Sequence, residues 1–304
     1  MTDLVSIVIP VHRRRRFLAE AVESVAGQTH GAWEVVLVDD GSAGGLDRTL
    51  ARIGERGRIV PGPNRGPASA RNAGIGVARG EWVLCLDEDD RLLPQALSAL
   101  LEAAATEGRQ WAAGRFRYID ADGRPLARRH RGRFAGGDVY AALIEGCQFG
   151  PPAVVLCRRE AMLAGGGFPD DWRFAEDHAL WLRIARDHPL AAVATDVAEY
   201  RVHDEQASRN WQGAFLGTLE ALAREEAAAR PGFADHFRRA RARTALEFGD
   251  AWRHHGGDPE ARHWWKAAGR DDPALASTAR WRRLKSYVPR PGRAGGPTDD
   301  PGLR

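Results

Sequence analysis

Residues 82–90 read WVLCLDEDD, an apolar run that ends in four acidic residues. The run has the length of one buried β-strand, and residues 5–10 (VSIVIP) and 35–40 (VVLVDD) have the same form. Apolar residues at helical spacing lie between these runs, over 17–25 and 68–78. Strands that alternate with helices in this way predict an α/β fold with a mostly parallel, twisted sheet and helices on both faces.

Acidic residues stand where two of the predicted strands end. Asp39 and Asp40 end one strand, and Asp87 and Asp89 follow another. Because ligands of open α/β sheets bind beyond the carboxyl ends of the strands, we expect both pairs to face one crevice. A hard divalent cation takes such oxygen ligands and bridges phosphate oxygens. The alternatives are a solvated acidic turn after the later strand and an ordinary polar turn after the earlier one.

The rest of the chain divides by composition. Up to residue 210 the sequence predicts one domain, whose pattern becomes less regular beyond about residue 93. Residues 211–288 are rich in Ala, Arg, Glu and Leu and predict a helical extension, and the Pro- and Gly-rich residues 289–304 predict a disordered tail. Further elements are expected over 46–53 (helix), 58–60 (strand), 111–119 (strand), 154–156 (strand) and 176–187 (helix).

Composition narrows the class of protein. The chain has 304 residues and a net charge of +3, which argues against an arginine-rich nucleic-acid binder, since such a domain is strongly basic. No apolar run approaches the ~18 residues that span a bilayer, and the arginines at 13–16 follow the first apolar run, so we expect a cytoplasmic protein without a signal peptide. Residues 281–287 mix aromatic and cationic side chains, and both contact with the inner membrane surface and packing as a last helix stay open. Three cysteines, none at CxxC spacing, are expected as reduced thiols: Cys85, Cys147 and Cys157.

A series of motifs, in this order, resembles glycosyltransferase family 2. The motifs are VSIVIPV at 5–11, AVESV at 21–25 with Gln28-Thr29, VDDGS at 38–42, Asn64-Arg65-Gly66, Ala70-Arg71-Asn72, LDEDD at 86–90, Gly166-Gly167-Phe168, Glu176-Asp177 and Trp181-Leu182-Arg183. The resemblance covers roughly residues 4–205 and implies the GT-A fold. In this fold a nucleotide-binding α/β half, here about 1–93, is fused to an acceptor half, here about 94–210. Gly74 and Gly76 fall inside a predicted helix, so they are not a dinucleotide-binding fingerprint.

The resemblance implies a donor site and a metal site at the acidic strand ends. Asp40 would accept the imide N–H of a uracil or thymine ring, and Pro10 would line the base pocket with its backbone. Asp89 would bind Mn²⁺ or Mg²⁺ directly, and Asp87 would contact the ribose or the waters of the metal. Arg71 would approach the base or the diphosphate, or else lie on the surface of its helix.

The resemblance also implies a base and a possible third metal ligand. Asp177 would take the proton of the acceptor hydroxyl, with Glu176 as the fallback, although acids at a helix N-terminus also simply stabilise the helix. His203, with Ser208 five residues later, would bind the metal or the diphosphate, although a histidine in a loop is more often a surface residue. Glu88 stands where some family members have a second aspartate, and its role stays open.

Together these residues predict an inverting, metal-dependent glycosyltransferase. It would move a sugar from a nucleoside diphosphate sugar, of the UDP or dTDP type, to a hydroxyl of a saccharide, lipid-linked or protein acceptor, in the synthesis of a bacterial surface polysaccharide or glycoconjugate. The alternative is a non-catalytic subunit on the same fold that binds nucleotide sugars. A degenerate protein would usually lack Asp89 or Asp177, and this chain has both.

Overall fold

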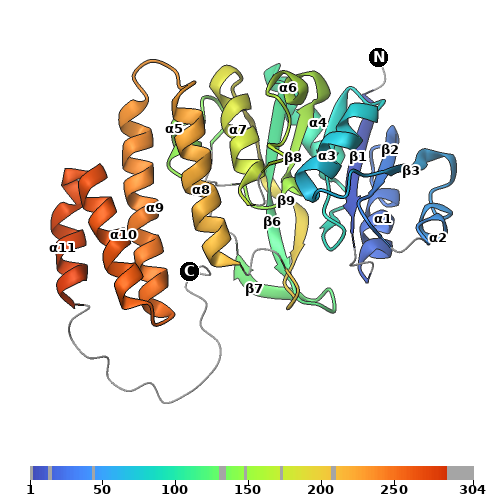
Figure 1. The fold of residues 1–304 in the computed structure, drawn as a ribbon. Helices are drawn as coiled ribbons and strands as arrows, with labels where there is room; N and C mark the ends of the chain where they lie inside the picture. The colour runs from blue at the N-terminus through green and yellow to red at the C-terminus, as the bar shows by residue number, and fades with distance from the viewer. Residues whose placement is uncertain are drawn as a thin grey trace. The chain divides into compact units, whose positions relative to one another are not determined.

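The computed structural model describes residues 3–12, 16–42, 45–129, 135–146, 149–171, 174–206 and 210–285. The chain divides into two compact units. We call Met1–Leu143 with Cys147–Gln206 the sheet unit, and Ile144–Gly146 with Ala207–Arg304 the helical unit. Figure 1 traces the elements of both.

The sheet unit is built on one sheet with the strand order β3-β2-β1-β4-β8-β6-β9-β5, and β7 pairs with β6. The strands are β1 (Val5–Val11), β2 (Trp33–Asp39), β3 (Gly57–Pro61), β4 (Trp82–Cys85), β5 (Arg91–Leu92), β6 (Trp111–Ile119), β7 (Pro125–Arg129), β8 (Val155–Arg158) and β9 (Ala191–Arg201).

The first four strands in the chain form the parallel part of this sheet. β1 pairs in parallel with β2 and β4, and β2 pairs in parallel with β3. The sheet then becomes mixed, because β8 runs antiparallel to both β4 and β6, while β9 is parallel to β6 and antiparallel to β5. The predicted α/β class is confirmed, and the parallel character belongs to the half that carries the acidic strand ends.

Helices of the sheet unit cover the sheet. They are α1 (Leu18–Ala26), α2 (Asp47–Leu50), α3 (Pro67–Val77), α4 (Ala96–Glu107), α5 (Tyr140–Ile144, whose last residue belongs to the helical unit), α6 (Arg159–Ala164) and α7 (Glu176–Asp187). The α-helix predicted over 46–53 is shorter than expected, since turns follow it from Ala51.

Helix α3 lies directly on the parallel strands, in contact with β1 and β2. A Cβ atom at Gly74 would come within 2.3 Å of a methyl carbon of Val8 and 3.0 Å of one of Val38. Gly74 therefore allows the helix to pack closely on the sheet, in agreement with its exclusion as a nucleotide fingerprint.

The helical unit contains α8 (Trp211–Glu226), α9 (Ala234–His254), α10 (Asp258–Asp271) and α11 (Ala276–Lys285), with a 3₁₀ turn at Pro273–Leu275. The predicted C-terminal helical extension is thus confirmed. Its core includes Trp265, whose side chain is buried and whose Nε1 donates to Asp250 Oδ1 at 3.0 Å. In the part of the chain that the structure describes, no helix combines the length and apolar character that crossing a bilayer requires.

Two of the three cysteines lie in the described residues. Cys85 and Cys157 are free and buried, and burial raises the pKa of the Cys85 thiol to about 12. Both are expected to stay protonated at neutral pH. Cys147, Ser208, the arginines at 13–15 and the tail over 289–304 lie outside the described residues.

Candidate functional site

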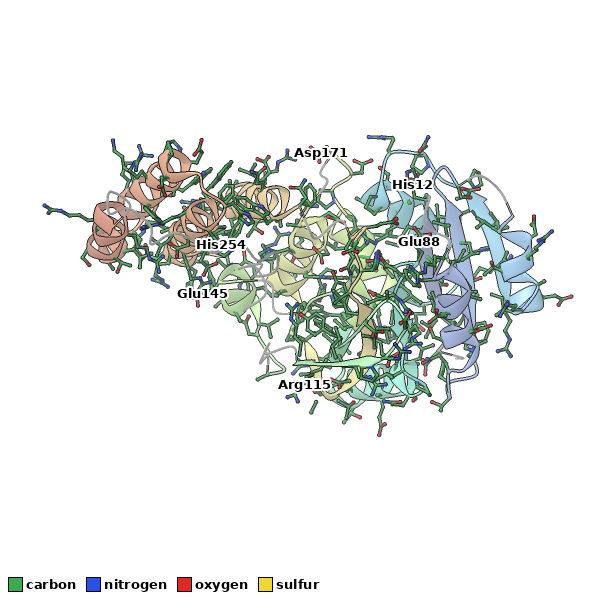
Figure 2. The ribbon with its side chains drawn as sticks, turned by 90° about the horizontal axis from the view of Figure 1, so that it is seen from below. His12, Glu88, Arg115, Glu145, Asp171 and His254 are labelled. Atoms are coloured by element: carbon green, nitrogen blue, oxygen red, sulfur yellow. The ribbon has the colours of Figure 1, made fainter. Side chains whose placement is uncertain are left out.

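The carboxyl ends of β1, β2 and β4 bring the predicted donor residues to one edge of the sheet. Pro10 pairs with Val38 in the parallel register of β1 and β2. Beyond β4 the backbone stays beside β1, since Leu86 N donates to Val8 O at 2.9 Å. In Figure 2, His12 marks the end of β1 and Glu88 marks the acidic turn that follows β4.

Asp39 and Asp40 have different surroundings although they are neighbours. Asp39 Oδ1 accepts the backbone N–H of Ser42 at 2.7 Å and closes the turn after β2. Asp40 is only 3% exposed, and its Oδ2 accepts the N–H of Gly66 at 2.9 Å. Asp40 Oδ1 has no hydrogen-bond donor among the described residues. Because a buried carboxylate oxygen without a donor is costly, this oxygen is suited to accept a ligand N–H.

The turn after β4, which we call the acidic turn (residues 87–90), holds its carboxylates in distinct contacts. Asp89 Oδ2 accepts from His203 Nε2 at 2.9 Å. Asp90 is buried, and its Oδ1 accepts the backbone N–H of Arg201 at 2.9 Å. Glu88 is half-buried on the same turn.

Burial and mutual repulsion raise the pKa values of two carboxyl groups in this turn. Burial raises the pKa of Asp89, the charge of Asp87 adds to the rise, and the contact with His203 opposes it. Burial also raises the pKa of Asp90 well above its usual range, with Asp89 and Asp87 adding to the effect. A cation near Asp89 would relieve this repulsion.

Arg71 on α3 joins the acidic turn to the start of α7. Its side chain is 4% exposed; Nη2 donates to Asp87 Oδ1 at 2.6 Å and Nη1 to Glu176 Oε1 at 2.8 Å. The guanidinium carbon also lies 5.3 Å from the ring centre of Phe168. Burial opposes the charge, but Asp87 and Glu176 outweigh it and raise the pKa of Arg71. Arg71 is therefore buried between two carboxylates, and the surface position considered for it is wrong.

Asp177 lies in the first turn of α7 and is half-buried. Its Oδ1 accepts the N–H of His178 at 2.7 Å. Burial raises the pKa of Asp177, Asp87 raises it further, and Arg71 lowers it. Glu176, in contrast, has one carboxylate oxygen in an ion pair with Arg71. Asp177 is therefore the better placed of the two acids to accept a proton from a ligand.

Backbone strain precedes these acids. Ala175, the residue before α7, has φ +59°, a left-handed conformation that costs a non-glycine residue about 1–2 kcal/mol. Strain of this kind is concentrated at functional sites, where the surrounding structure holds it. It sets the direction in which the chain enters α7, and with it the position of Glu176 and Asp177.

Two contributions of single residues were not predicted. Asn72, next to Arg71, holds the loop before α7: its Nδ2 donates to Phe168 O at 2.7 Å, and its Oδ1 accepts from Phe168 N at 2.9 Å. Arg201 contacts the acidic turn from the end of β9. Asn72 lies inside a family motif and Arg201 precedes His203 by two residues. The partners of both are distant in sequence, so the spacing of residues could not predict these contacts.

Asp89 and His203 are the candidates for direct contact with a metal ion at this site. Within the described ranges, no three or more His, Cys, Asp or Glu side chains are grouped so that they could hold a metal ion. One carboxylate and one imidazole still fit Mn²⁺ or Mg²⁺ at a diphosphate, since such ions take few protein ligands and complete their shell with phosphate oxygens and water.

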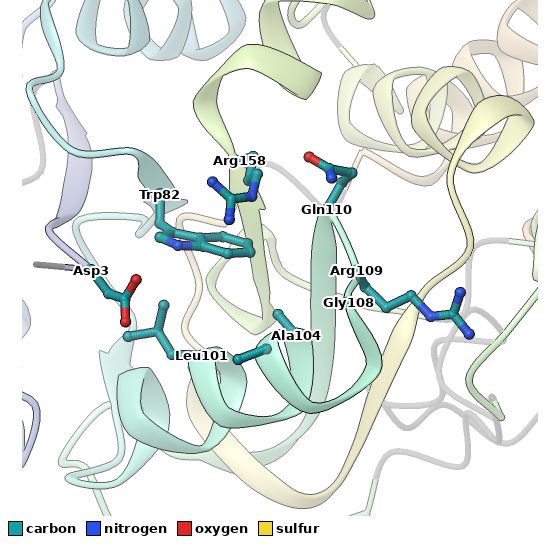
Figure 3. A pocket seen from close by; sticks show the side chains of 9 residues that line it. Asp3, Trp82, Leu101, Ala104, Gly108, Arg109, Gln110 and Arg158 are labelled. Atoms are coloured by element: carbon teal, nitrogen blue, oxygen red, sulfur yellow. The ribbon is translucent and has the colours of Figure 1, made fainter. Parts of the chain in front are cut away.

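A cavity of about 220 Å³ lies at the other end of the strands (Figure 3). Trp82, which begins β4, and Arg158, which ends the antiparallel strand β8, line it together with Asp3, Leu101 and Gln110. The guanidinium carbon of Arg158 lies 4.6 Å from the ring centre of Trp82. This cavity contains none of the predicted site residues.

Comparison with known proteins identifies the family. The sequence model of glycosyl transferase family 2 matches residues 6–163. An uncharacterized glycosyltransferase of Rickettsia bellii is 28% identical over 67% of this chain and 29% of its own length. The putative teichuronic acid biosynthesis glycosyltransferase TuaG of Bacillus subtilis is 29% identical over 69% of this chain and 84% of its own length.

Among solved structures, S. aureus TarS in complex with UDP-GlcNAc aligns with a TM-score of 0.69 at 16% identity, over 93% of this chain and 89% of that one. The chain spans about a third or less of the length of the rickettsial relatives it matches. The shared fold is the GT-A type, and the family match covers more than half of the sequence. The chain therefore belongs to glycosyltransferase family 2.

Proposed function

We propose that this protein is an inverting, metal-dependent glycosyltransferase that moves a sugar from a nucleoside diphosphate sugar to an acceptor hydroxyl. The observation that carries the proposal is the position of Arg71. One guanidinium bonds both Asp87 of the acidic turn and Glu176, the neighbour of Asp177. These contacts support a single site that contains both the predicted donor residues and the predicted base.

The donor is a uridine or thymidine diphosphate sugar. The buried Oδ1 of Asp40 has no donor among the described residues and is suited to the imide N–H of these bases. Pro10 lies on the adjacent strand end and would line the base pocket. The complex of TarS with UDP-GlcNAc, a protein of the same fold, favours UDP. Arg71 supports this site by orienting Asp87 for the ribose, since both of its terminal nitrogens are engaged in ion pairs.

Asp89 and His203 would hold the divalent cation. When bound, the cation neutralises charge on the departing diphosphate. The contact between Asp89 Oδ2 and His203 Nε2 at 2.9 Å places an oxygen and a nitrogen side by side at the strand ends. Nε2 would bind the cation in the tautomer in which it carries no proton.

Asp177 would act as the general base. It would take the proton of the acceptor hydroxyl as that oxygen bonds to the anomeric carbon, while the bond from this carbon to the phosphate oxygen breaks. Attack from the side opposite the leaving group inverts the anomeric configuration. A pKa above the ordinary aspartate value makes the carboxylate a better proton acceptor than a solvated one.

The rival is a non-catalytic subunit that binds nucleotide sugars without transfer. The half-buried Asp177, whose pKa is raised at the same site, favours the enzyme.

The name of TuaG, teichuronic acid biosynthesis, favours a role in making a surface polysaccharide. A saccharide, lipid-linked or protein acceptor fits this role.

Calorimetric titration with UDP tests the donor site. Wild-type protein is titrated in Mn²⁺ and in EDTA, and Asp89→Ala and Asp40→Ala are compared. We expect Asp89→Ala to lose only the Mn²⁺-dependent part of the affinity, and Asp40→Ala to lose affinity in both buffers, because its partner is the base. Metal-dependent UDP binding that persists in Asp89→Ala contradicts the metal assignment. Wild-type protein that binds UDP but transfers no sugar to any acceptor supports the rival.

A further inference from the structure

Arg201, the last residue of β9, is a fully buried arginine that touches three segments of the sheet unit. Its Nη2 donates to Glu20 Oε2 on α1 at 2.7 Å. Its Nη1 donates to the carbonyl oxygens of Asp120 and Ala121, in the turn between β6 and β7, at 3.4 and 3.2 Å. Its guanidinium carbon lies 4.3 Å from the ring centre of Phe17.

The third segment is the acidic turn. Arg201 Nε donates to the backbone carbonyl of Asp89 at 2.8 Å, and the backbone N–H of Arg201 donates to Asp90 Oδ1 at 2.9 Å. Two residues further along, His203 Nε2 contacts Asp89 Oδ2 at 2.9 Å. The end of β9 thus holds Asp89 twice, through its backbone and through its carboxylate.

The guanidinium has no direct part in binding a substrate. Its side chain is 0% exposed, and each of its three nitrogens donates to a protein oxygen. A buried cation is costly unless it is paired and its N–H groups are satisfied, and Arg201 meets both conditions through Glu20 and the carbonyl oxygens. This arrangement stabilises one geometry of the segments around it.

We propose that Arg201 is a positioning residue for the metal and diphosphate site. It fixes the backbone of Asp89, so that the carboxylate of Asp89 and the imidazole of His203 converge on the same cation. The inference rests on the proposed function, because it assumes that Asp89 is the metal ligand. It goes beyond that proposal because it assigns the placement of the Asp89 carboxylate to Arg201, a residue that contacts neither the metal nor the donor.

Arg201→Lys is the test, with Arg91→Lys as its matched control. Arg91 bonds the same Glu20 oxygen at 3.1 Å, the carbonyl of Gly123, in the same turn, at 3.0 Å, and Glu199 Oε2 at 2.7 Å. Although Arg91 directly follows the acidic turn in sequence, its side chain has no hydrogen bond to that turn among the described residues. A lysine keeps the charge and loses the planar fork. At position 201 its ammonium should pair with Glu20 and release the carbonyl of Asp89.

The readout is UDP affinity by calorimetry, once in Mn²⁺ and once in EDTA. We expect Arg201→Lys to weaken UDP binding in Mn²⁺ by about 10-fold or more, the usual effect of losing an outer partner of a metal ligand. Binding in EDTA should stay at the wild-type level, and Arg91→Lys should match wild type in both buffers. A merely structural role would lower affinity in both buffers or in neither.

Several outcomes overturn the inference. Wild-type Mn²⁺ dependence in Arg201→Lys, an equal loss in both buffers, or an equal loss in Arg91→Lys would each do so while leaving the proposed function standing. Wild-type protein that binds UDP without regard to Mn²⁺ overturns both. If Arg201→Lys fails to fold, Glu20→Gln replaces it, since the Glu20 side chain is 41% exposed and its loss loosens the anchor of Arg201. A selective loss in Mn²⁺ is again expected, and its absence overturns the inference.

Discussion

At the scale of single residues, Asp177 carries the sharpest expectation. Asp177→Asn keeps the shape of the side chain and its bond to His178 but cannot accept a proton. We expect kcat for sugar transfer to fall by about 10²–10⁴-fold, the usual contribution of a positioned general base. UDP affinity in Mn²⁺ should persist, because the predicted donor contacts lie on the strand ends. The loss should appear in kcat more than in the KM of the donor.

The control is Asp187→Asn, at the last residue of the same helix, where the side chain is 61% exposed and paired with Arg186. It should leave kcat unchanged. Near-normal transfer by Asp177→Asn would move the base to another carboxylate. A loss of UDP binding together with turnover would mean that Asp177 mainly stabilises the start of α7.

Arg71 should set the acidic limit of activity. A carboxylate base works only when ionised, so kcat rises with pH through its pKa. Burial raises the pKa of Asp177, which places this rise above about 3.9, the ordinary aspartate value. Arg71 lowers the same pKa, so Arg71→Gln should move the rise to higher pH. Arg71→Lys, which keeps a cation, should move it less.

The measurement is kcat against pH at saturating donor. Arg65→Gln is the control, since Arg65 is a neighbouring arginine with a 61% exposed side chain paired with Asp170. An acidic limb that stays in place in Arg71→Gln would exclude electrostatic coupling between Arg71 and the base.

Residue types at strand ends could be predicted from sequence because the chemistry there is local. An apolar run followed by Asp39 or Asp87 is visible without knowledge of the fold, and the structure brings these residues to one edge. The partners of Arg71 could not be predicted in the same way. Arg71 and Glu176 are 105 positions apart, and only the folded sheet unit brings them within 2.8 Å. The family resemblance pointed to Arg71 as a site residue, but its partners could be identified only from the structure.

At the scale of elements, the loop before α7 should depend on one glycine. Gly166 and Gly167 both have positive φ, at +80° and +68°. A Cβ atom at Gly167 would lie 2.6 Å from Asn72 Oδ1, whereas at Gly166 the nearest atom is an Arg183 nitrogen at 3.6 Å. Gly166→Ala should lower the free energy of unfolding by about 1–2 kcal/mol, the cost of the left-handed conformation.

Gly167→Ala should cost at least about 1 kcal/mol more, since it displaces Asn72 from the backbone of Phe168 and breaks hydrogen bonds there. Because this loop leads to Asp177, kcat should also fall in Gly167→Ala more than in Gly166→Ala. Urea unfolding and steady-state kinetics measure both effects. Equal effects of the two substitutions would mean that the contact with Asn72 adds nothing beyond backbone strain.

Elements with a strong local pattern could be predicted, and β9 could not. The buried runs of β1, β2 and β4 and the apolar spacing of α1, α3 and α7 are each visible within one segment. β9 reads AAVATDVAEYR, with many small and polar residues, and its strand character comes from pairing with β6 and β5. Because β9 was not predicted, the sequence could not show that Arg201 and His203 lie at the end of a strand beside the acidic turn.

At the scale of the whole molecule, the candidate site draws only on the sheet unit. Each residue assigned to donor, metal or base belongs to Met1–Leu143 or Cys147–Gln206. We therefore propose the sheet unit as the glycosyltransferase domain and the helices from Trp211 to Lys285 as a separate extension.

A role of residues 289–304 in activity is not expected from their composition, and removal of these residues should leave turnover on a soluble acceptor unchanged.

Two buried tryptophans can separate the stabilities of the units. Trp111 in the sheet unit and Trp265 in the helical unit are 0% and 1% exposed, and the Nε1 of each donates one hydrogen bond at 3.0 Å. Truncation to alanine should cost about 3–5 kcal/mol in either core. Because a ligand that binds only the folded state stabilises it, we expect UDP to raise the melting temperature of the unit that contains the proposed donor site.

Scanning calorimetry with and without UDP and Mn²⁺ should therefore resolve two responses. Trp111→Ala should lower the transition that UDP raises and weaken UDP binding at temperatures where the sheet unit begins to unfold. Trp265→Ala should lower a transition that UDP does not move, and UDP affinity at 25 °C should equal that of wild type. If both variants lower one common transition that UDP raises, the chain unfolds as a single cooperative unit. The donor site would then depend on the helical unit for its stability, and the proposed separation into domain and extension would be wrong.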